Sequence, residues 1–194
     1  MSSPLKMTFL AAVADHESLP PARVEIAFLG RSNVGKSSLL NALAGEKQLA
    51  RVSSMPGRTQ VLTSFQLDRS DARLIDCPGY GYAQVSKAQR KGWLPMLERY
   101  LLEREQLTMA LLLVDGEIGP TDSDVYMLGW LREHEVPVTV VATKRDKVKP
   151  SHRDRRKKEV AGACGLELGE VVWVSADDQF GIPVLRDLVR SWLG

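Results

Sequence analysis

The sequence has few cysteines, almost no excess of charge and no long apolar run, and each absence excludes a class of protein. Its two cysteines, Cys77 and Cys164, can neither build a disulfide framework nor supply zinc-ligand spacing, which favours a reducing compartment. Lysine and arginine total 26 against 24 acidic residues, so any polyanion must bind a local basic patch. Apolar runs such as residues 109–114 are far shorter than the roughly 18 residues that indicate a transmembrane helix. We therefore expect a cytoplasmic protein with no membrane partner.

The length of the chain sets its domain organisation. With 194 residues and a mass of 21.5 kDa, it forms one domain of ordinary size. We expect an N-terminal extension, residues 1–21, followed by a globular domain, residues 22–194. Residues 7–14 are apolar and end like a signal peptide, but only Lys6 precedes them as positive charge, so secretion is not expected. This segment would pair as an edge strand or pack on the core.

Short apolar runs typical of strands alternate with segments of helical periodicity. Six strands are predicted, at residues 24–29, 61–67, 73–77, 109–115, 138–143 and 171–174. The alternation predicts an α/β fold, in which a mostly parallel six-stranded sheet has helices on both faces in a three-layer sandwich. A ligand should then bind at the carboxyl ends of the strands.

Four helices have recognisable ends or faces. Residues 36–44 stop at Gly45, and residues 121–135 begin with a capping-box pattern. Residues 87–105 contain Gly92 and Pro95, so a kink or two separate pieces are expected. In the last helix, Arg186 lies off the apolar face that should pack on the sheet, which consists of Val184, Leu185, Leu188, Val189 and Trp192.

A phosphate loop follows the first predicted strand and decides the class of protein. Residues 30–37 have the full G-x-x-x-x-G-K-S pattern directly before a helix. The glycines let successive amide groups point at one phosphate, Lys36 neutralises the outer phosphates, and the Ser37 hydroxyl binds magnesium. These features predict a P-loop NTPase whose nucleotide contacts include Gly30, Arg31, Ser32, Asn33, Val34, Gly35, Lys36, Ser37 and Ser38.

A second motif selects the base. It lies at the carboxyl ends of two predicted apolar strands, residues 138–143 and 171–174. The residues at the first are Thr143, Lys144, Arg145 and Asp146, and those at the second are Val174, Ser175 and Ala176. The Asp146 carboxylate can accept hydrogen bonds from the ring N–H and the exocyclic amine of guanine, whereas adenine presents an acceptor and a C–H there. The stem of Lys144 would lie along the base, and the Ala176 amide would donate to the guanine carbonyl. GTP is therefore favoured over ATP.

Two segments between these motifs have the composition of nucleotide-dependent switches. They are Gly57, Arg58, Thr59, Gln60 and Val61, and Asp76, Cys77, Pro78 and Gly79. Thr59 offers a second hydroxyl to magnesium, and Asp76 would hold the ion through water. The Gly79 amide would meet the γ-phosphate. We assign the catalytic contacts to Lys36, Thr59 and Gly79.

At these residues the sequence resembles the EngB (YsxC, YihA) family of bacterial GTPases, in the Era-like translation-factor class. The resemblance covers nearly the whole chain and rests on residues 30–40, 49–60, 76–83 and 143–146. Thr143 replaces the more common asparagine, as in the family, whereas Cys77 is less usual at its position. The resemblance implies a GTPase that assembles the large ribosomal subunit, with rRNA and ribosomal proteins as partners and effects on cell division and septation. We expect a monomer.

The residue after Gly79 is Tyr80, where Ras-like GTPases have a glutamine that orients the attacking water. An aromatic ring cannot do this, so we expect slow intrinsic hydrolysis, on the order of 10⁻⁴ s⁻¹ or lower, until an ion, a residue in cis or a partner completes the site. Asn33 stands where potassium-dependent relatives have a cation ligand, although asparagine equally favours a turn there. Solvation or RNA contact suits Arg31 and Arg58 better than catalysis.

Residues 144–158 hold nine lysines and arginines against two aspartates, a local charge of +7. Such a run is typical of an RNA-binding surface and equally of a solvated helix face. Lys87, Arg90, Lys91 and Trp93 place a second basic surface after the second switch.

Three other functions are compatible with a phosphate loop. A small-molecule kinase needs an acceptor site and usually a lid, for which the sequence gives no sign. A membrane-transport GTPase needs an anchor, and no lipidation motif is visible. A GTP-dependent binding module for RNA or protein, with negligible turnover, stays open because of Tyr80.

Overall fold

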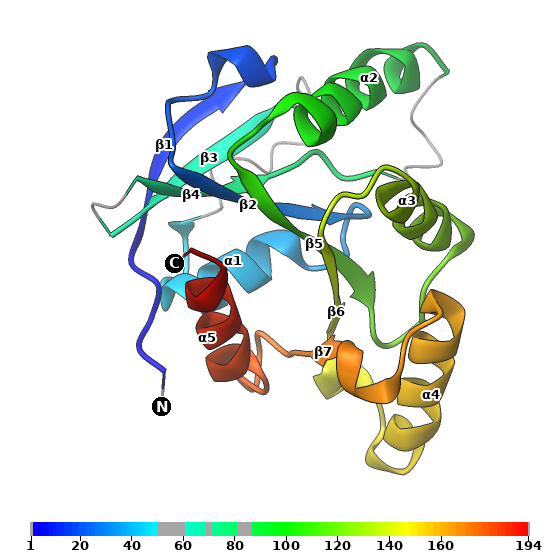
Figure 1. Cartoon of the computed structure of the whole chain (residues 1–194). Helices are drawn as coiled ribbons and strands as arrows, with labels where there is room; N and C mark the ends of the chain where they lie inside the picture. The colour runs from blue at the N-terminus through cyan, green and yellow to red at the C-terminus, as the bar shows by residue number, and fades with distance from the viewer. Residues whose placement is uncertain (1, 50–60, 69–70, 81–86, 194) are drawn as a thin grey trace.

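The computed structural model describes residues 2–49, 61–68, 71–80 and 87–193, with the backbone alone for residues 87–94 (Figure 1). Within these residues the chain forms one seven-stranded sheet in the order β1-β3-β4-β2-β5-β6-β7. The strands are β1 (Met7–Val13), β2 (Val24–Gly30), β3 (Leu62–Leu67), β4 (Ala72–Asp76), β5 (Leu107–Asp115), β6 (Val138–Thr143) and β7 (Val172–Trp173). Strands β4, β2, β5, β6 and β7 pair in parallel, and β1 and β3 are antiparallel. The expected mostly parallel α/β sheet is confirmed.

The sheet has seven strands, rather than the six expected, because residues 7–13 form an edge strand. Strand β1 pairs antiparallel with β3, with a register shift between Phe9 and Ala11. Of the two arrangements the sequence allowed for this segment, pairing at the edge is therefore the correct one. On its other side β3 pairs antiparallel with β4, with Thr63 opposite Asp76.

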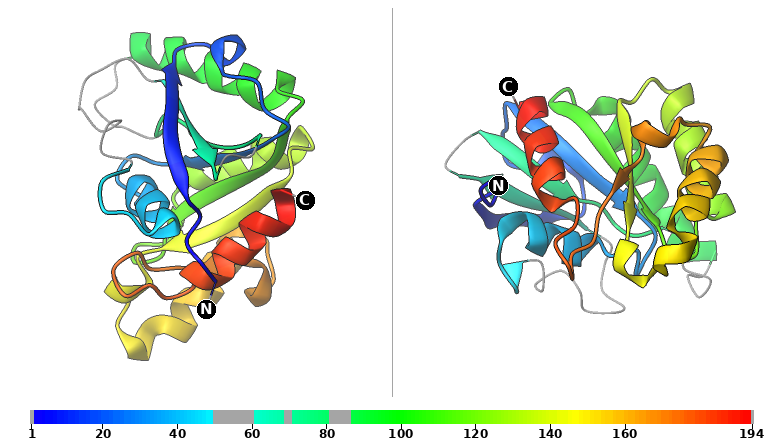
Figure 2. Two further views of the ribbon diagram at one scale, coloured as in Figure 1. Left: turned by 90° about the vertical axis from the view of Figure 1, so that its left-hand side faces the viewer. Right: turned by 90° about the horizontal axis from the view of Figure 1, so that it is seen from below.

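Helices cover both faces of the sheet, as expected (Figure 2). Helices α1 (Lys36–Ala44) and α5 (Ile182–Leu193) pack on one face, and α2 (Lys87–Glu103), α3 (Asp122–Glu133) and α4 (Arg153–Cys164) pack on the other. Short 3₁₀ turns occupy His16–Ser18, Arg145–Lys147, Pro150–His152 and Leu168–Glu170. Helix α2 continues through Pro95, so of the two alternatives expected there, a kink or two pieces, the second is wrong. No helix in the described part of the chain is long and apolar enough to cross a membrane.

The central strand β2 shows why the sheet needs two helical layers. All seven of its residues are buried. Ile26 and Phe28 face α1 and α5, whereas Ala27 and Leu29 face the opposite core. A parallel strand buried on both faces has a nearly continuous apolar sequence rather than an alternating one, as this strand does.

Helix α5 differs from its sequence prediction at two positions. Val184 is 59% exposed although the periodicity predicts that it lies on the packed face, and Arg186 is 8% exposed although the periodicity predicts that it lies off that face. The Arg186 guanidinium donates hydrogen bonds to the carbonyls of Ala42 (2.6 Å), Leu43 (3.0 Å) and Ser2 (3.1 Å). The last carbonyls of a helix lack partners within it, so Arg186 caps the helix that follows the phosphate loop.

Replacing Arg186 with methionine should lower the free energy of unfolding by about 1–3 kcal/mol, because the Ala42 and Leu43 carbonyls each lose the guanidinium donor and keep only a backbone one. Urea unfolding of both proteins would measure the difference. Asp187→Asn, on the exposed side of α5, is the control and should leave the midpoint unchanged. Equal midpoints for wild type and Arg186→Met would contradict this role.

Candidate nucleotide-binding site

The phosphate loop connects β2 to α1 and depends on glycine at both ends. At Gly30, a Cβ atom would lie 2.8 Å from Val34 Cγ1 and 3.0 Å from the carbonyl oxygen of Leu113, too close for any side chain. Gly35 has a φ of +105° and is the N-cap of α1. Asn33 has a φ of +66°, a left-handed conformation that asparagine tolerates. The turn role of Asn33 is therefore present, and its potassium role stays a prediction.

The loop brings its charged and hydroxyl side chains to the start of α1. The Lys36 ammonium lies 3.4 Å from the Gly30 carbonyl, so it turns back over the loop rather than away from it. Ser37 is half-buried and Ser38 is exposed in the first turn of the helix. A helix N-terminus with a lysine turned back over a glycine-rich loop is suited to binding a chain of phosphates.

Asp76 ends β4 beside this loop and has the properties of a magnesium-site carboxylate. Its side chain is buried, and its Oδ1 has no hydrogen-bond partner among the described residues. Burial raises the pKa of Asp76 to about 6, and the charge of Lys36 opposes this shift. A buried carboxylate oxygen without a donor fits a hydrated cation, so the residues present suit magnesium.

Cys77, Pro78 and Gly79 continue from β4 along the phosphate loop. Cys77 is buried, and burial raises the pKa of its thiol, which keeps it protonated. A Cβ atom on Gly79 would lie 2.7 Å from Ser32 Oγ and 2.9 Å from Ser32 N. Only glycine fits this approach, which places the residue expected to meet the γ-phosphate directly against the loop.

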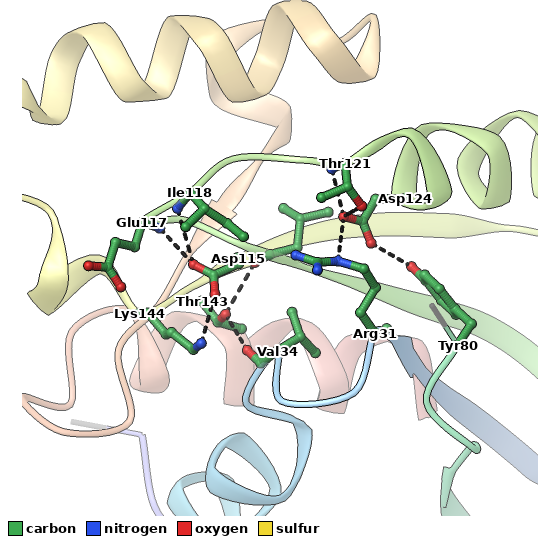
Figure 3. Close-up of polar contacts among 12 residues, drawn as sticks. Arg31, Val34, Tyr80, Asp115, Glu117, Ile118, Thr121, Asp124, Thr143 and Lys144 are labelled. Atoms are coloured by element: carbon green, nitrogen blue, oxygen red, sulfur yellow. Dashed lines mark hydrogen bonds and ion pairs between the residues drawn. The ribbon is translucent and has the colours of Figure 1, made fainter. Parts of the chain in front are cut away.

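Both the backbone and the side chain of Tyr80 make hydrogen bonds, and Figure 3 shows the side-chain contact with Asp124. Its backbone pairs with the phosphate loop, since its amide donates to the Gly30 carbonyl (3.3 Å) and its carbonyl accepts from the Ser32 amide (3.2 Å). Its ring is 5% exposed, and its hydroxyl donates to Oδ1 of Asp124 on α3 (3.0 Å). The side chain therefore points toward α3.

The base motif is tied to the phosphate loop by a hydrogen bond. The Thr143 hydroxyl donates to the Val34 carbonyl at 2.6 Å. Lys144 follows with a φ of +55°, and its ammonium lies 2.7 Å from Oδ2 of Asp115, at the end of the neighbouring strand β5. The other carboxylate oxygen of Asp115 accepts from the amides of Glu117 and Ile118 (Figure 3). The ion pair restricts how Lys144 can lie along a bound base.

Asp146 is oriented by the second strand end of the motif. Ser175 donates from its hydroxyl to Oδ1 of Asp146 at 2.8 Å. Partial burial would raise the pKa of Asp146, but hydrogen bonds from Ser175 and Lys147 outweigh it and lower that pKa, so the carboxylate is charged at neutral pH. Arg145, between Lys144 and Asp146, has its guanidinium 3.5 Å from the Phe180 ring centroid. This cation–π contact holds the Arg145 side chain in place.

Of the remaining predicted nucleotide contacts, three lie in the described part of the chain and four lie outside it. The Val174 carbonyl accepts from the Arg145 amide at 3.2 Å, so the two strand ends meet, and Ala176 follows them directly. Val61 lies just before β3. Four predicted contacts lie outside the described residues, namely Gly57, Arg58, Thr59 and Gln60.

Two aspartates that contact site residues, Asp115 and Asp124, are absent from the set predicted from the sequence. Asp115 ends an apolar strand just before Gly116, a position that can carry a site residue in a parallel sheet. Asp124 was assigned only to a helix cap. Its contacts with Arg31 and Tyr80 span 93 and 44 residues, so no local pattern could reveal them.

Thr143→Val should weaken the binding of GDP and GTP by a similar factor of about ten, the effect of one lost buried hydrogen bond. Valine keeps the shape of the side chain but leaves the Val34 carbonyl without its donor. Titration calorimetry with both nucleotides measures the change. Thr139→Val, on the same strand, is the control and should bind like wild type. Unchanged affinity in Thr143→Val would show that the link to the loop does not support the site.

Comparison with known proteins agrees with this geometry. Residues 25–144, more than half of the chain, match a family model described as 50S ribosome-binding GTPase. Probable GTP-binding proteins EngB from Pelotomaculum thermopropionicum and Thermotoga maritima are 43% and 50% identical over 188 and 176 residues. These alignments cover 96% and 90% of this chain, and 94% and 89% of the relatives. A crystal structure of a probable GTP-binding protein engB has a TM-score of 0.72 at 25% identity, covering 87% of this chain and 98% of its own.

Proposed function

The chain belongs to the EngB family of GTP-binding proteins, and from this premise we propose that it is a molecular switch that hydrolyses GTP to GDP and phosphate. One observation carries the proposal: the Thr143–Val34 hydrogen bond joins the base motif to the phosphate loop at one end of the sheet. The link brings the residues proposed to hold the base next to those proposed to hold the phosphates. In this proposal every nucleotide contact lies within residues 22–194, and β1 adds an edge strand to the same sheet.

Each part of the nucleotide has its own group of residues in this proposal. Residues 30–38 hold the phosphates, and residues 143–146 and 174–176 hold guanine, with Asp146 as its acceptor. Ser37, Thr59 and, through water, Asp76 would hold magnesium, which supplies positive charge to the phosphates when bound. Lys36 adds charge there, and the Gly79 amide donates to the γ-phosphate. Residues 57–61 and 76–79 act as the switches.

Hydrolysis by the chain alone is proposed to be slow. The Tyr80 hydroxyl already donates to Asp124, and the ring is buried, so this side chain does not orient a water as glutamine would. A potassium ion near Asn33, or the ribosome, would complete the site.

Binding and turnover assays test this activity. GTP and GDP should bind far more tightly than ATP, and magnesium should be required for phosphate release. Release should be slow in sodium and faster in potassium if Asn33 holds the ion. Equal affinity for ATP and GTP would overturn the proposed function, whereas equal rates in both salts would remove only the potassium role.

The proposed partner is the large ribosomal subunit or its precursor, with a family-implied link to cell division and septation. Basic residues on and before α4 support an RNA partner. They surround a pocket of about 250 Å³ lined by Glu117, Lys147, Val148, Lys149, His152, Arg155 and Arg156. Phosphates of RNA bind such concentrations of positive charge. The protein would act in the cytoplasm as a monomer.

The alternative is a binding module in which GTP orders a surface for RNA or protein and turnover is negligible. The engaged Tyr80 favours this alternative. Phosphate release over several turnovers in the presence of large subunits separates the two, because only the switch turns over repeatedly.

A further inference from the structure

Asp124 is the strongest candidate for a role beyond the nucleotide contacts. Its side chain is 1% exposed, and four hydrogen bonds converge on it. Tyr80 donates to Oδ1 at 3.0 Å, and Arg31 donates to Oδ2 at 3.1 Å. The amide and hydroxyl of Thr121 each donate to Oδ2 at 2.8 Å. A helix cap explains the Thr121 bonds but not the other two.

The two additional donors belong to the phosphate site. Arg31 is the second residue of the phosphate loop, and Tyr80 directly follows Gly79. Their backbones form an isolated parallel bridge, so the loop and the residue after Gly79 are already paired. Asp124 joins the same two segments through their side chains (Figure 3).

We propose that Asp124 is a positioning residue for the γ-phosphate: it holds Tyr80 against α3 and thereby fixes Gly79 beside the phosphate loop. The inference rests on the proposed function, since it assumes that Gly79 meets that phosphate. Gly79 packs against Ser32 so closely that a Cβ atom would lie 2.7 Å from the serine hydroxyl. Because Tyr80 directly follows Gly79, a shift of Tyr80 would move the Gly79 amide relative to the phosphate loop.

The chemistry of the contact explains why a carboxylate is needed. Both Tyr80 and Arg31 donate, so one buried group must accept on both sides and carry the charge that pairs with Arg31. An asparagine at position 124 has only one side-chain oxygen that can accept. Its NH₂ group would therefore face either the Tyr80 hydroxyl or the Arg31 guanidinium, both of which donate. In Tyr80→Phe, the ring is kept and only the hydroxyl is lost.

GDP and a non-hydrolysable GTP analogue separate positioning from general stability, because GDP has no γ-phosphate. Tyr80→Phe and Asp124→Asn should each weaken analogue binding about tenfold relative to GDP binding, within the usual range of coupling between sites. In steady-state hydrolysis kcat should fall by more than KM rises. Loss of a merely structural contact would affect both nucleotides equally.

Thr121→Val is the matched control. It removes the Thr121 hydroxyl from Asp124 but leaves the bonds from Tyr80 and Arg31, so the ratio of the two affinities should equal that of wild type. Thermal melting of each variant confirms folding, and Tyr80→Phe keeps the test valid if Asp124→Asn is unstable. An unchanged ratio in Tyr80→Phe, or a shift toward the GTP analogue, would overturn the inference. If wild type bound neither nucleotide, the proposed function itself would fail.

Discussion

Asp146→Asn should lower affinity for GTP by roughly 10⁴-fold and create affinity for xanthosine triphosphate. The carboxylate accepts from two donors on the guanine edge, whereas a carboxamide presents one acceptor and one donor. Xanthine has a ring N–H and a carbonyl at the same two places, so the asparagine side chain complements it. Ser175 still has an oxygen to which it can donate, so the orientation of residue 146 is kept.

Equilibrium binding of GTP, XTP and ATP to wild type and variant measures this reversal. Asp177→Asn is the matched control, because Asp177 lies near Asp146 and shares the ion pair with Lys147 but is 72% exposed. It should retain the preference for GTP. An Asp146→Asn variant that still preferred GTP over XTP would contradict the assignment of the base site.

Asp76→Asn should have opposite effects on stability and activity. The folded state raises the pKa of this carboxyl from 3.8 to about 6 because it is buried. Between these values the folded chain holds a proton that the unfolded chain has lost, so stability falls as pH rises through this window. Above pH 6, the buried charge costs on the order of 2–3 kcal/mol in the nucleotide-free protein. Asparagine removes that cost, but it also removes the carboxylate proposed for magnesium.

Urea unfolding of the nucleotide-free, magnesium-free protein should show the variant to be more stable at pH 7.5, with a difference that shrinks toward pH 4. Phosphate release from GTP should fall about 10- to 100-fold, the usual effect of losing an outer-shell metal partner. Asp122→Asn, at an exposed position of α3, should change neither quantity. A variant of lower stability at pH 7.5 would contradict the account of Asp76.

The phosphate loop and the base motif could be predicted because each is a short pattern that follows a buried strand. Spacing alone places Gly30, Lys36 and Ser37 together between β2 and the first turn of α1, and parallel strands bring residues 143–146 and 174–176 to the same end of the sheet. Helix ends at Gly45 and Thr121 were also predictable, since their signals lie within one turn.

What the sequence did not predict depends on contacts between distant segments. Arg186 has the periodicity of a solvated position, and its burial becomes favourable through the carbonyls of Ser2 and of the last turn of α1. Residues 7–13 could pair or pack, and the free edge of β3 decides between these outcomes. The hydroxyl of Tyr80 contacts Asp124, which lies 44 residues later in the chain, and local patterns do not encode such a contact.

Co-sedimentation with purified large ribosomal subunits and their precursors tests the proposed switch most directly. The protein would be loaded with a non-hydrolysable GTP analogue or with GDP, at the same potassium and total salt, because basic surfaces bind RNA in a salt-dependent way. The account predicts that the complex forms with the analogue and is lost with GDP. Equal binding in both states, or none in either, would contradict a role for the nucleotide in controlling ribosome binding.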